Sequence, residues 1–336
     1  MASSKKLLSI ESAGLSANAL VKAVASSLAR HVLPRQRVAV GLSGGMDSVS
    51  LLHALYALNT GREAFNLSAI HVHHGISPHA DQWDVFCREY CERLRVPYVK
   101  VHVTVERLSK DGLEGAARRA RHAAFADVDA DWLMLAHQRD DQAETILFNL
   151  LRGSGVAGAA AMRERSGKLL RPMLSVGRDE VERYVRLHQL EWCEDESNTD
   201  TRYSRNLLRR DIIPALTQRF PATTKNLAAA AARFAEAHEL LNELALVDLD
   251  GAAARFPLDL KQLNALAEPR ARNLLRYLLT INQVQIPSEA RLREALRQML
   301  DAEADRHPSL VFGQHRLLRR RGWVYLEPVE ACADKR

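Results

Sequence analysis

Short apolar runs alternate with amphipathic segments four times between residues 37 and 151, and this alternation constrains the fold more than any other feature. The run at 38–42 is apolar throughout, which is typical of a strand buried inside a parallel sheet. Because parallel strands need long crossovers, usually helices, we predict an α/β fold, a doubly wound parallel sheet with helices on both faces. The predicted strands are 38–42, 67–73, 97–103 and 132–136, and the predicted helices are 15–33, 47–58, 81–94, 114–126 and 140–151.

Helical patterns dominate the chain beyond residue 151. The predicted helices are 178–188, 205–216, 226–246, 270–280 and 288–300. Alternation over 309–327, with turns at Gly313 and Gly322, predicts one or two short hairpins. A chain of 336 residues is expected to form about two domains, and 220–224 is the best boundary. We therefore predict a Rossmann-like domain over 1–220 and a smaller, mainly helical domain with a short β tail over 225–336.

The composition is that of an ordinary globular protein, with 47% hydrophobic and 26% charged residues. No apolar run approaches the roughly 18 residues that a membrane helix needs, so no membrane partner is expected. The N-terminus has no signal-peptide pattern and the chain has only four cysteines, so we predict a cytoplasmic protein without a disulfide framework. A net charge of +6 permits an anionic partner such as nucleic acid but does not require one.

The segment Ser43-Gly44-Gly45-Met46-Asp47-Ser48 joins the first predicted sheet strand to a helix. Glycines allow close backbone approach, and the N–H groups and dipole of a helix start attract an anion. The segment is neither a Walker A sequence nor G-x-G-x-x-G. A strand-to-helix turn without a ligand is the alternative, but the six residues together favour nucleotide binding. Since the Asp47 carboxylate does not attract phosphate directly, it suggests a bridging Mg²⁺.

Two further motifs carry histidine and arginine. His71, His73 and His74 end the second predicted strand, next to Gly75. A metal site is one interpretation of them, but strand-end histidines near the nucleotide crevice are favoured, because no cysteine or carboxylate adjoins. On the third predicted helix, a pair of arginines shares a face, and they are Arg118 and Arg121. They form either a solvated charged face or a phosphate-binding pair.

The junction of the fourth predicted strand and helix reads Ala-His-Gln-Arg-Asp-Asp-Gln-Ala-Glu-Thr over 136–145. His137, Asp141 and Glu144 fall on one face of the helix start. The helix dipole explains one carboxylate there, but less readily several. The pair Asp141 and Glu144 could hold a cationic amine or Mg²⁺.

The loop at 43–48 resembles that of the PP-loop ATP pyrophosphatase superfamily. Seven segments in order across residues 37–210 then resemble the tRNA(Ile)-lysidine synthetase family. They are S-G-G-M-D-S, H-V-x-H-G, E-x-x-A-R-x-x-R, A-H-x-x-D-D-Q-A-E-T, L-R-G-S-G, R-P-M-L, and D-x-S-N with R-N-x-x-R. Members of this family use ATP to adenylate the wobble cytidine of a CAU-anticodon isoleucine tRNA. The lysine side-chain amine then displaces AMP, leaving lysidine.

The resemblance implies roles for individual residues. It implies ATP binding by loop 43–48 with His74, Gly75 and Arg121, and Mg²⁺ binding by Asp47. It implies lysine binding by Asp141, Glu144 and His137. The catalytic residues that it implies are Asp47, Arg118, Asp141, Glu144 and Arg205. Which carboxylate binds lysine, and which accepts its proton, stays open.

The implied partners are the isoleucine tRNA and free L-lysine, with a homodimer as one option. Arginines on the predicted helices of the second domain either grip tRNA or form a solvated mixed-charge face. These arginines are Arg270, Arg272, Arg276, Arg291, Arg293 and Arg297.

Three other functions compete with this interpretation. A 2-thiocytidine-forming relative needs paired C-x-x-C cysteines, which this chain lacks. A glutamine-dependent synthetase of the same superfamily needs an amidase region with a catalytic cysteine. A non-catalytic tRNA-binding relative would need neither the loop 43–48 nor the acidic motif at 140–145.

Overall fold

The computed structural model describes residues 18–106, 112–194, 204–285, 288–303 and 306–329. The chain divides into two compact units, Met1–Ala235 and Glu236–Arg336. The boundary lies inside a helix, α11 (Thr223–Asp248), and later than the sequence boundary at 220–224. The segment 220–224, which contains proline and threonine, lies at the start of α11. Composition therefore marks where this helix begins, and it does not mark the division between the two units.

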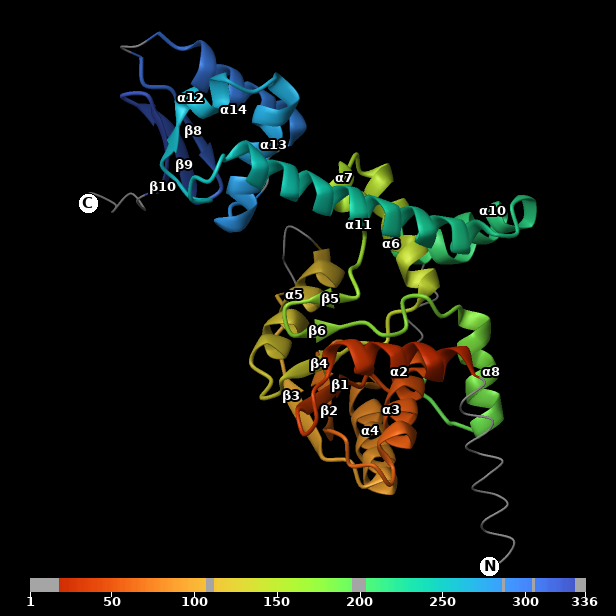
Figure 1. Ribbon diagram of the computed structural model, residues 1–336. Coiled ribbons are helices and arrows are strands. Elements are labelled where there is room, and N and C mark those ends of the chain that lie inside the picture. The colour runs from red at the N-terminus through yellow and green to blue at the C-terminus, as the bar shows by residue number, and fades with distance from the viewer. Residues whose placement is uncertain (1–17, 107–111, 195–203, 286–287, 304–305, 330–336) are drawn as a thin grey trace, which may run out of the picture. The chain divides into compact units, whose positions relative to one another are not determined.

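The first unit contains a six-stranded sheet in the order β3-β2-β1-β4-β6-β5 (Figure 1). All neighbouring pairs are parallel except β5 with β6. The strands are β1 (Arg37–Gly41), β2 (Asn66–His73), β3 (Tyr98–His102), β4 (Trp132–Met134), β5 (Arg165–Ser166) and β6 (Leu169–Leu170). The helices are α2 (Ala19–His31), α3 (Met46–Asn59), α4 (Ala80–Leu94), α5 (Gly112–Ala126), α6 (Arg139–Leu151), α7 (Val156–Ala159), α8 (Arg178–His188), α9 (Ser204–Leu207) and α10 (Ile213–Arg219).

Residues of β1 pack alternately toward two separate cores. Val38 and Val40 join the large cluster that α2, α3, α4 and α8 build on one face. Ala39 joins a second cluster on the other face, where Phe125 of α5 packs against Leu133. The apolar run of β1 is therefore buried on both sides, which confirms the predicted doubly wound parallel sheet.

Several features of the first unit were not predicted, among them the short helix α7. The hairpin of β5 and β6 has two-residue strands, which are too short to show a period in the sequence. The predicted helix 205–216 is interrupted by a π-helical turn, η2 (Leu208–Ile212). Pro214 follows this turn and has no N–H to continue the regular ladder, and the N–H of Ile213 bonds back to the carbonyl of Leu208.

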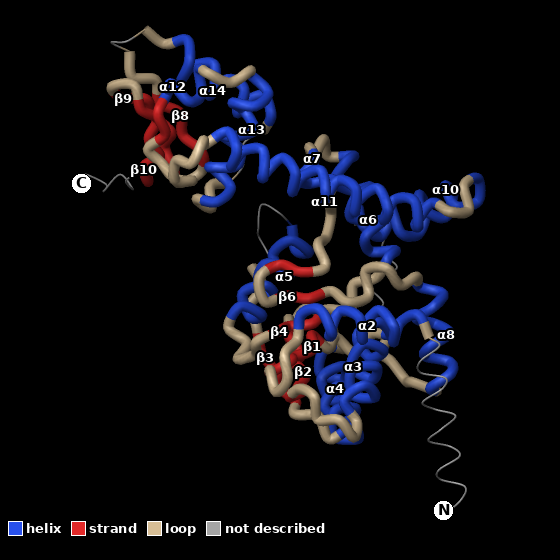
Figure 2. Tube along the Cα trace, viewed as in Figure 1, coloured by secondary structure: helices blue, strands red, loops and turns tan. Residues whose placement is uncertain are grey.

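The second unit combines helices with an antiparallel sheet in the order β7-β10-β9-β8 (Figure 2). Its helices are α12 (Leu260–Asn264), α13 (Glu268–Ile281) and α14 (Glu289–Asp301). Its strands are β7 (Leu258–Asp259), β8 (Ser309–Phe312), β9 (His315–Arg320) and β10 (Trp323–Pro328). Turns at Gly313 and at Arg321-Gly322 join the last three strands, as the sequence predicts. The short β7 was not predicted.

Candidate active site

The loop between β1 and α3 is shaped by backbone conformation and by its two serines. Gly44 has φ +88°, and a Cβ there would lie 3.3 Å from the sulfur of Cys87. Ser48 accepts the N–H of Ser43 at 3.2 Å and donates to the carbonyl of Gly45 at 2.9 Å. Gly45 is the N-cap of α3, so the first N–H groups of this helix open into the site.

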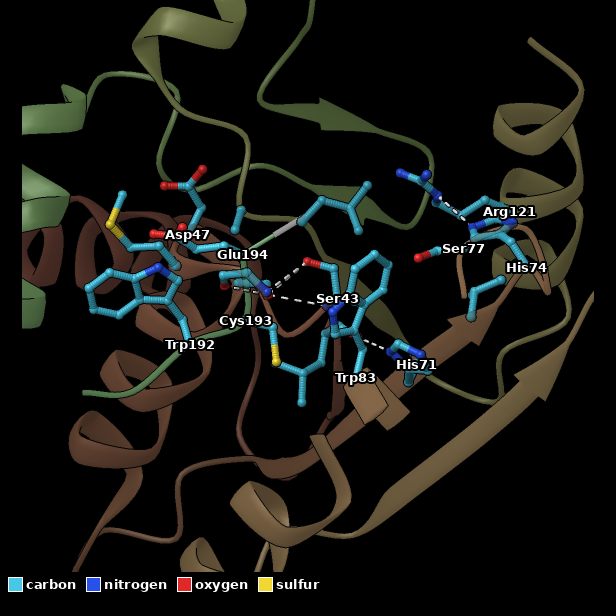
Figure 3. A pocket seen from close by; sticks show the side chains of 18 of the residues that line it. Ser43, Asp47, His71, His74, Ser77, Trp83, Arg121, Trp192, Cys193 and Glu194 are labelled. Carbon is cyan, nitrogen blue, oxygen red and sulfur yellow. Dashed lines mark hydrogen bonds between the residues drawn. The ribbon is translucent and has the colours of Figure 1, made fainter. Parts of the chain in front are cut away.

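An open cavity of about 1310 Å³ lies over this loop. Figure 3 shows Asp47, Trp192 and Cys193 on one side of Ser43, and His71, His74 and Arg121 on the other. One part of the wall is apolar and includes Ile70, Phe125 and Leu135, while the loop supplies hydroxyl and backbone donors. The cavity thus offers an apolar surface for a base beside a polar loop for phosphates.

The histidines at the end of β2 and directly after it hold the structure of the cavity wall. His71 is buried and donates from Nδ1 to the carbonyl of Leu42 at 2.8 Å, which fixes β2 against the loop. His73 contacts Asp81 through Nε2 at 3.0 Å. His74 lines the cavity, where burial and Arg121 lower its pKa to about 4. Among the described residues, no group of three or more His, Cys, Asp and Glu is arranged to hold a metal ion.

Asp47 is the carboxylate residue of loop 43–48 and lies at the start of α3. Gln138 donates from Nε2 to both of its oxygens, each at 3.2 Å. Burial and then the neighbouring charge of Asp141 raise the pKa of Asp47 to about 7. The Oε1 atom of Gln138 is buried and has no hydrogen-bond partner. A carboxylate oxygen that lines the cavity beside this loop is the kind of ligand that a Mg²⁺ ion bound with a triphosphate takes.

Asp141 and Glu144 lie side by side on α6, as the sequence predicts, and both bind Arg209. Arg209 donates to Glu144 at 2.6 and 3.0 Å and to Asp141 at 2.9 Å. The second oxygen of Asp141 accepts the N–H of Gln138 at 2.9 Å and caps the helix. Burial raises the pKa of both carboxyls, and the guanidinium of Arg209 opposes that rise.

A second cavity of about 420 Å³ is lined in part by this group. It shares Asp47, Asp141, Arg178 and Arg209 with the larger cavity. Glu144 lines only the smaller one. Asp47, Asp141, Arg178 and Arg209 therefore lie on the wall that both cavities share.

The arginines Arg118, Arg121 and Arg205 lie around His137. Burial first, and then these three together with Arg171, lower the pKa of His137 to about 3, so its imidazole is neutral near pH 7. Arg121 donates to His74 at 3.4 Å and lines the large cavity. Arg118, Arg205 and Gly75 are not among the lining residues.

Sequence reasoning missed three residues of this site: Gln138, Arg178 and Arg209. Arg209 stands four residues after Arg205 in the R-N-x-x-R segment, on the same helical face. The available signal was the acidic pair itself, since two neighbouring buried carboxylates need a cation. The D-x-S-N segment and the side chain of Glu114 lie outside the described residues.

Comparison with known proteins places this site in a family. Residues 17–216 match the PP-loop domain model, and residues 258–325 match the TilS substrate binding domain. A tRNA(Ile)-lysidine synthase of Nitrosomonas europaea is 39% identical over 92% of this chain and 69% of its own length. The chain belongs to the tRNA(Ile)-lysidine synthase family. A member from Aromatoleum aromaticum is 43% identical over 90% of this chain and 71% of its own length.

A solved structure supports the fold assignment. The U34-tRNA thiolase NcsA from Methanococcus maripaludis has a TM-score of 0.53 and 22% identity, covering 65% of this chain and 78% of its own. Within the described residues, no helix is long and apolar enough to cross a membrane. The family matches cover the loop, the lining of the larger cavity and most of the sheet of the second unit, and they do not favour the 2-thiocytidine alternative.

Proposed function

We propose that this protein uses ATP to join lysine to C2 of the wobble cytidine of a CAU-anticodon isoleucine tRNA. The products are lysidine, AMP and pyrophosphate. The observation that carries the proposal is the group of Asp47, Asp141 and Arg209 on the wall shared by two cavities. In a two-step ligation, lysine must reach the adenylated cytidine that formed in the first step. Residues on a wall shared by two cavities can contact the reactants of both steps.

The first step is adenylation of the cytidine. ATP lies in the large cavity with its phosphates on loop 43–48, where Ser43, Gly45, Met46 and Ser48 line the wall. The C2 oxygen of cytidine attacks the α-phosphorus, and the bond to the bridging oxygen of pyrophosphate breaks. Arg118, Arg121 and Arg205 supply the positive field that the developing charge requires.

We propose that Asp47 contacts the Mg²⁺ ion that accompanies ATP. The ion would neutralise charge on the phosphates. The carboxylate of Asp47, which lines the large cavity and accepts from Gln138, is the oxygen ligand that fits it. Asp47 would then ionise fully, since a bound cation lowers the pKa that burial and Asp141 raise in its absence.

The second step is attack by lysine from the smaller cavity. We propose that its ammonium group competes with Arg209 for Asp141 and Glu144, while neutral His137 lies beyond them in the large cavity. Once a carboxylate has accepted a proton from the ammonium, the free amine attacks C2 and AMP leaves. The raised pKa of both carboxyls suits them to take that proton.

The second unit is proposed to bind the tRNA body, as the match to a substrate binding domain supports. A homodimer, a cytoplasmic location and the functional division at 220–225 stay predictions. Sedimentation equilibrium of the full chain tests the first of them.

The deciding experiment measures incorporation of radiolabelled lysine into RNA. It uses ATP, Mg²⁺ and two transcripts, the CAU-anticodon isoleucine tRNA and the initiator methionine tRNA. We expect label in the isoleucine transcript alone, and none with Asp47→Ala. RNA-dependent formation of AMP without label would keep the adenylation and reject lysine as the nucleophile. Binding of tRNA with neither signal would support a non-catalytic relative.

A further inference from the structure

The sheet of the second unit has two different faces. Phe312, Leu317 and Val324 point inward and pack against the buried leucines of α13 and α14. Since neighbouring residues of a strand point to opposite faces, the residues between them lie on the outer face. The outer face carries Val311, Arg316, Leu318, Arg320, Trp323, Tyr325 and Glu327.

Some side chains of this outer face are open to solvent, although Leu318 is buried. Trp323 and Val311 each keep 42% of their surface exposed. Trp323 lies directly opposite Arg320 in the register of β10 and β9. The guanidinium of Arg320 lies 6.0 Å from the ring centre of Tyr325. A ring, a stacked guanidinium and a second ring thus share one exposed surface.

The arginines of the helices in this unit are engaged within the protein. Arg276 pairs with Glu289 at 2.8 Å and Arg297 with Glu294 at 2.6 Å. The others are paired as well: Arg270 with Asp248, Arg272 with Glu268 and Glu289, and Arg293 with Glu268 and Glu289. Arg291 donates to the carbonyl of Val311 at 2.9 Å. These helices therefore form the mixed-charge face that was one of the two sequence interpretations.

Three arginines of the outer face and its β9–β10 turn differ in this respect, whereas Arg319 of β9 donates to the carbonyls of Met299 and Ala302. Arg316, Arg320 and Arg321 are exposed, and no carboxylate of the described chain lies within 4.0 Å of them. The acids on the same face are Glu327, opposite Arg316, and Asp259, whose carboxylate accepts the N–H of Lys261 at 2.9 Å. Counting Arg321 of the adjoining turn, three arginines stand against two carboxylates here, and their charge is available to a partner.

We propose that this outer face binds unpaired nucleotides of the tRNA substrate. Bases stack on Trp323 and Tyr325, and phosphates meet Arg316, Arg320 and Arg321. Flat rings interleaved with guanidinium groups suit exposed bases, which a duplex does not offer. The excess of arginine suits a polyanion. This inference rests on the proposed function, because it identifies the surface within the second unit that holds the RNA.

Fluorine NMR of the full chain, labelled with 5-fluorotryptophan, tests the contact directly. The chain has four tryptophans, and Trp323→Phe assigns the resonance of interest. We expect this resonance to shift when the isoleucine transcript or a short single-stranded RNA is added. A blunt RNA duplex of equal length should leave it in place. An unchanged Trp323 resonance with bound transcript would overturn the proposal.

Affinity measurements separate stacking from charge. Trp323→Leu keeps an apolar side chain and should weaken transcript binding about tenfold. Arg320→Gln should lower the slope of log affinity against log salt by about one. Arg297→Gln is the matched control, because it removes the same charge from an exposed, paired arginine of the same unit. If the control changes the slope equally, net charge explains the effect and the face has no special role.

Turnover separates this proposal from the proposed function. With Trp323→Leu, lysidine formation should show a raised KM for tRNA and an unchanged kcat. If the wild-type protein forms no lysidine but its Trp323 resonance shifts with RNA, the proposed function fails while the face stands. If Trp323→Leu instead dissociates a dimer and leaves RNA affinity unchanged, the face joins two copies of the chain and the proposal is wrong.

Discussion

At the scale of single residues, Asp47 makes pH dependence a test of the site. Burial and the charge of Asp141 raise its pKa from 3.8 to about 7. The folded protein therefore holds a proton that the unfolded chain releases above about pH 4. As the pH rises from about 4 to about 7, the free energy of unfolding falls. Above about pH 7 Asp47 is ionised in the folded protein, and the free energy of unfolding then carries the whole cost of burying that charge.

Asp47→Asn should remove this dependence in the protein without ATP. We expect the variant to be more stable than the wild type by about 1 kcal/mol or more near pH 8, and nearly equal near pH 4. Urea unfolding at both pH values measures the difference. Equal stabilities near pH 8 would mean that the carboxyl is ionised without cost. The variant should also lose ATP-dependent activity. A charge that function requires often reduces the stability of the folded protein.

Arg209 gives a second test at this scale, because it donates hydrogen bonds to two carboxylates. Removing it as Arg209→Met leaves Asp141 and Glu144 without their cation and should cost about 2 kcal/mol of stability. Adding Glu144→Gln should recover part of that loss, since the uncompensated charge is then gone. The neighbouring exposed Arg210→Met is the control and should be nearly neutral. A double variant as unstable as the sum of the singles would show that the pair is not coupled.

At the scale of elements, the loop before α3 depends on Gly44. Gly44→Ala places a Cβ at φ +88° and 3.3 Å from the sulfur of Cys87. We expect a loss of about 1–2 kcal/mol and weaker ATP binding. Gly61→Ala is the matched control, because Gly61 has φ +73° and open space around it. The loss of stability for Gly44→Ala should exceed that for Gly61→Ala by the cost of the contact with the sulfur of Cys87. Adding Cys87→Ala should therefore reduce the loss at position 44 and leave the loss at position 61 unchanged. Chemical denaturation and ATP titration measure both effects.

The elements also show what the sequence can and cannot predict. Long segments with a clear period, such as β2 and α14, were predicted to within a few residues, because burial on a face imposes that period. Asp141 and Glu144 were predicted as neighbours because helix geometry brings them together. Arg209 comes from a distant element, and the π-helical turn η2 that presents it has no sequence period. The contact between α6 and η2 depends on the tertiary fold, and a local sequence pattern does not predict it.

At the scale of the whole molecule, the two units have separate hydrophobic cores. The sheet of the first unit packs into two clusters made only of its own residues. The second unit is built around leucines of α13 and α14 with residues of β8, β9 and β10. The described residues that line the larger cavity all belong to the first unit. A ligand that binds one unit should therefore stabilise it without stabilising the other core directly.

Hydrogen exchange with and without ligands tests this independence. ATP at about one hundred times its Kd should raise the protection of β1, β4 and α3 by up to about 2.7 kcal/mol, with little change in β9 and β10. Adding the isoleucine transcript should protect β9 and β10 as well, because the RNA is expected to contact both units. Lysine alone should protect α6 and η2 only, where Asp141, Glu144 and Arg209 meet. Equal protection of both units by ATP alone would show that the two cores open together, so that nucleotide binding prepares the tRNA surface before any RNA arrives.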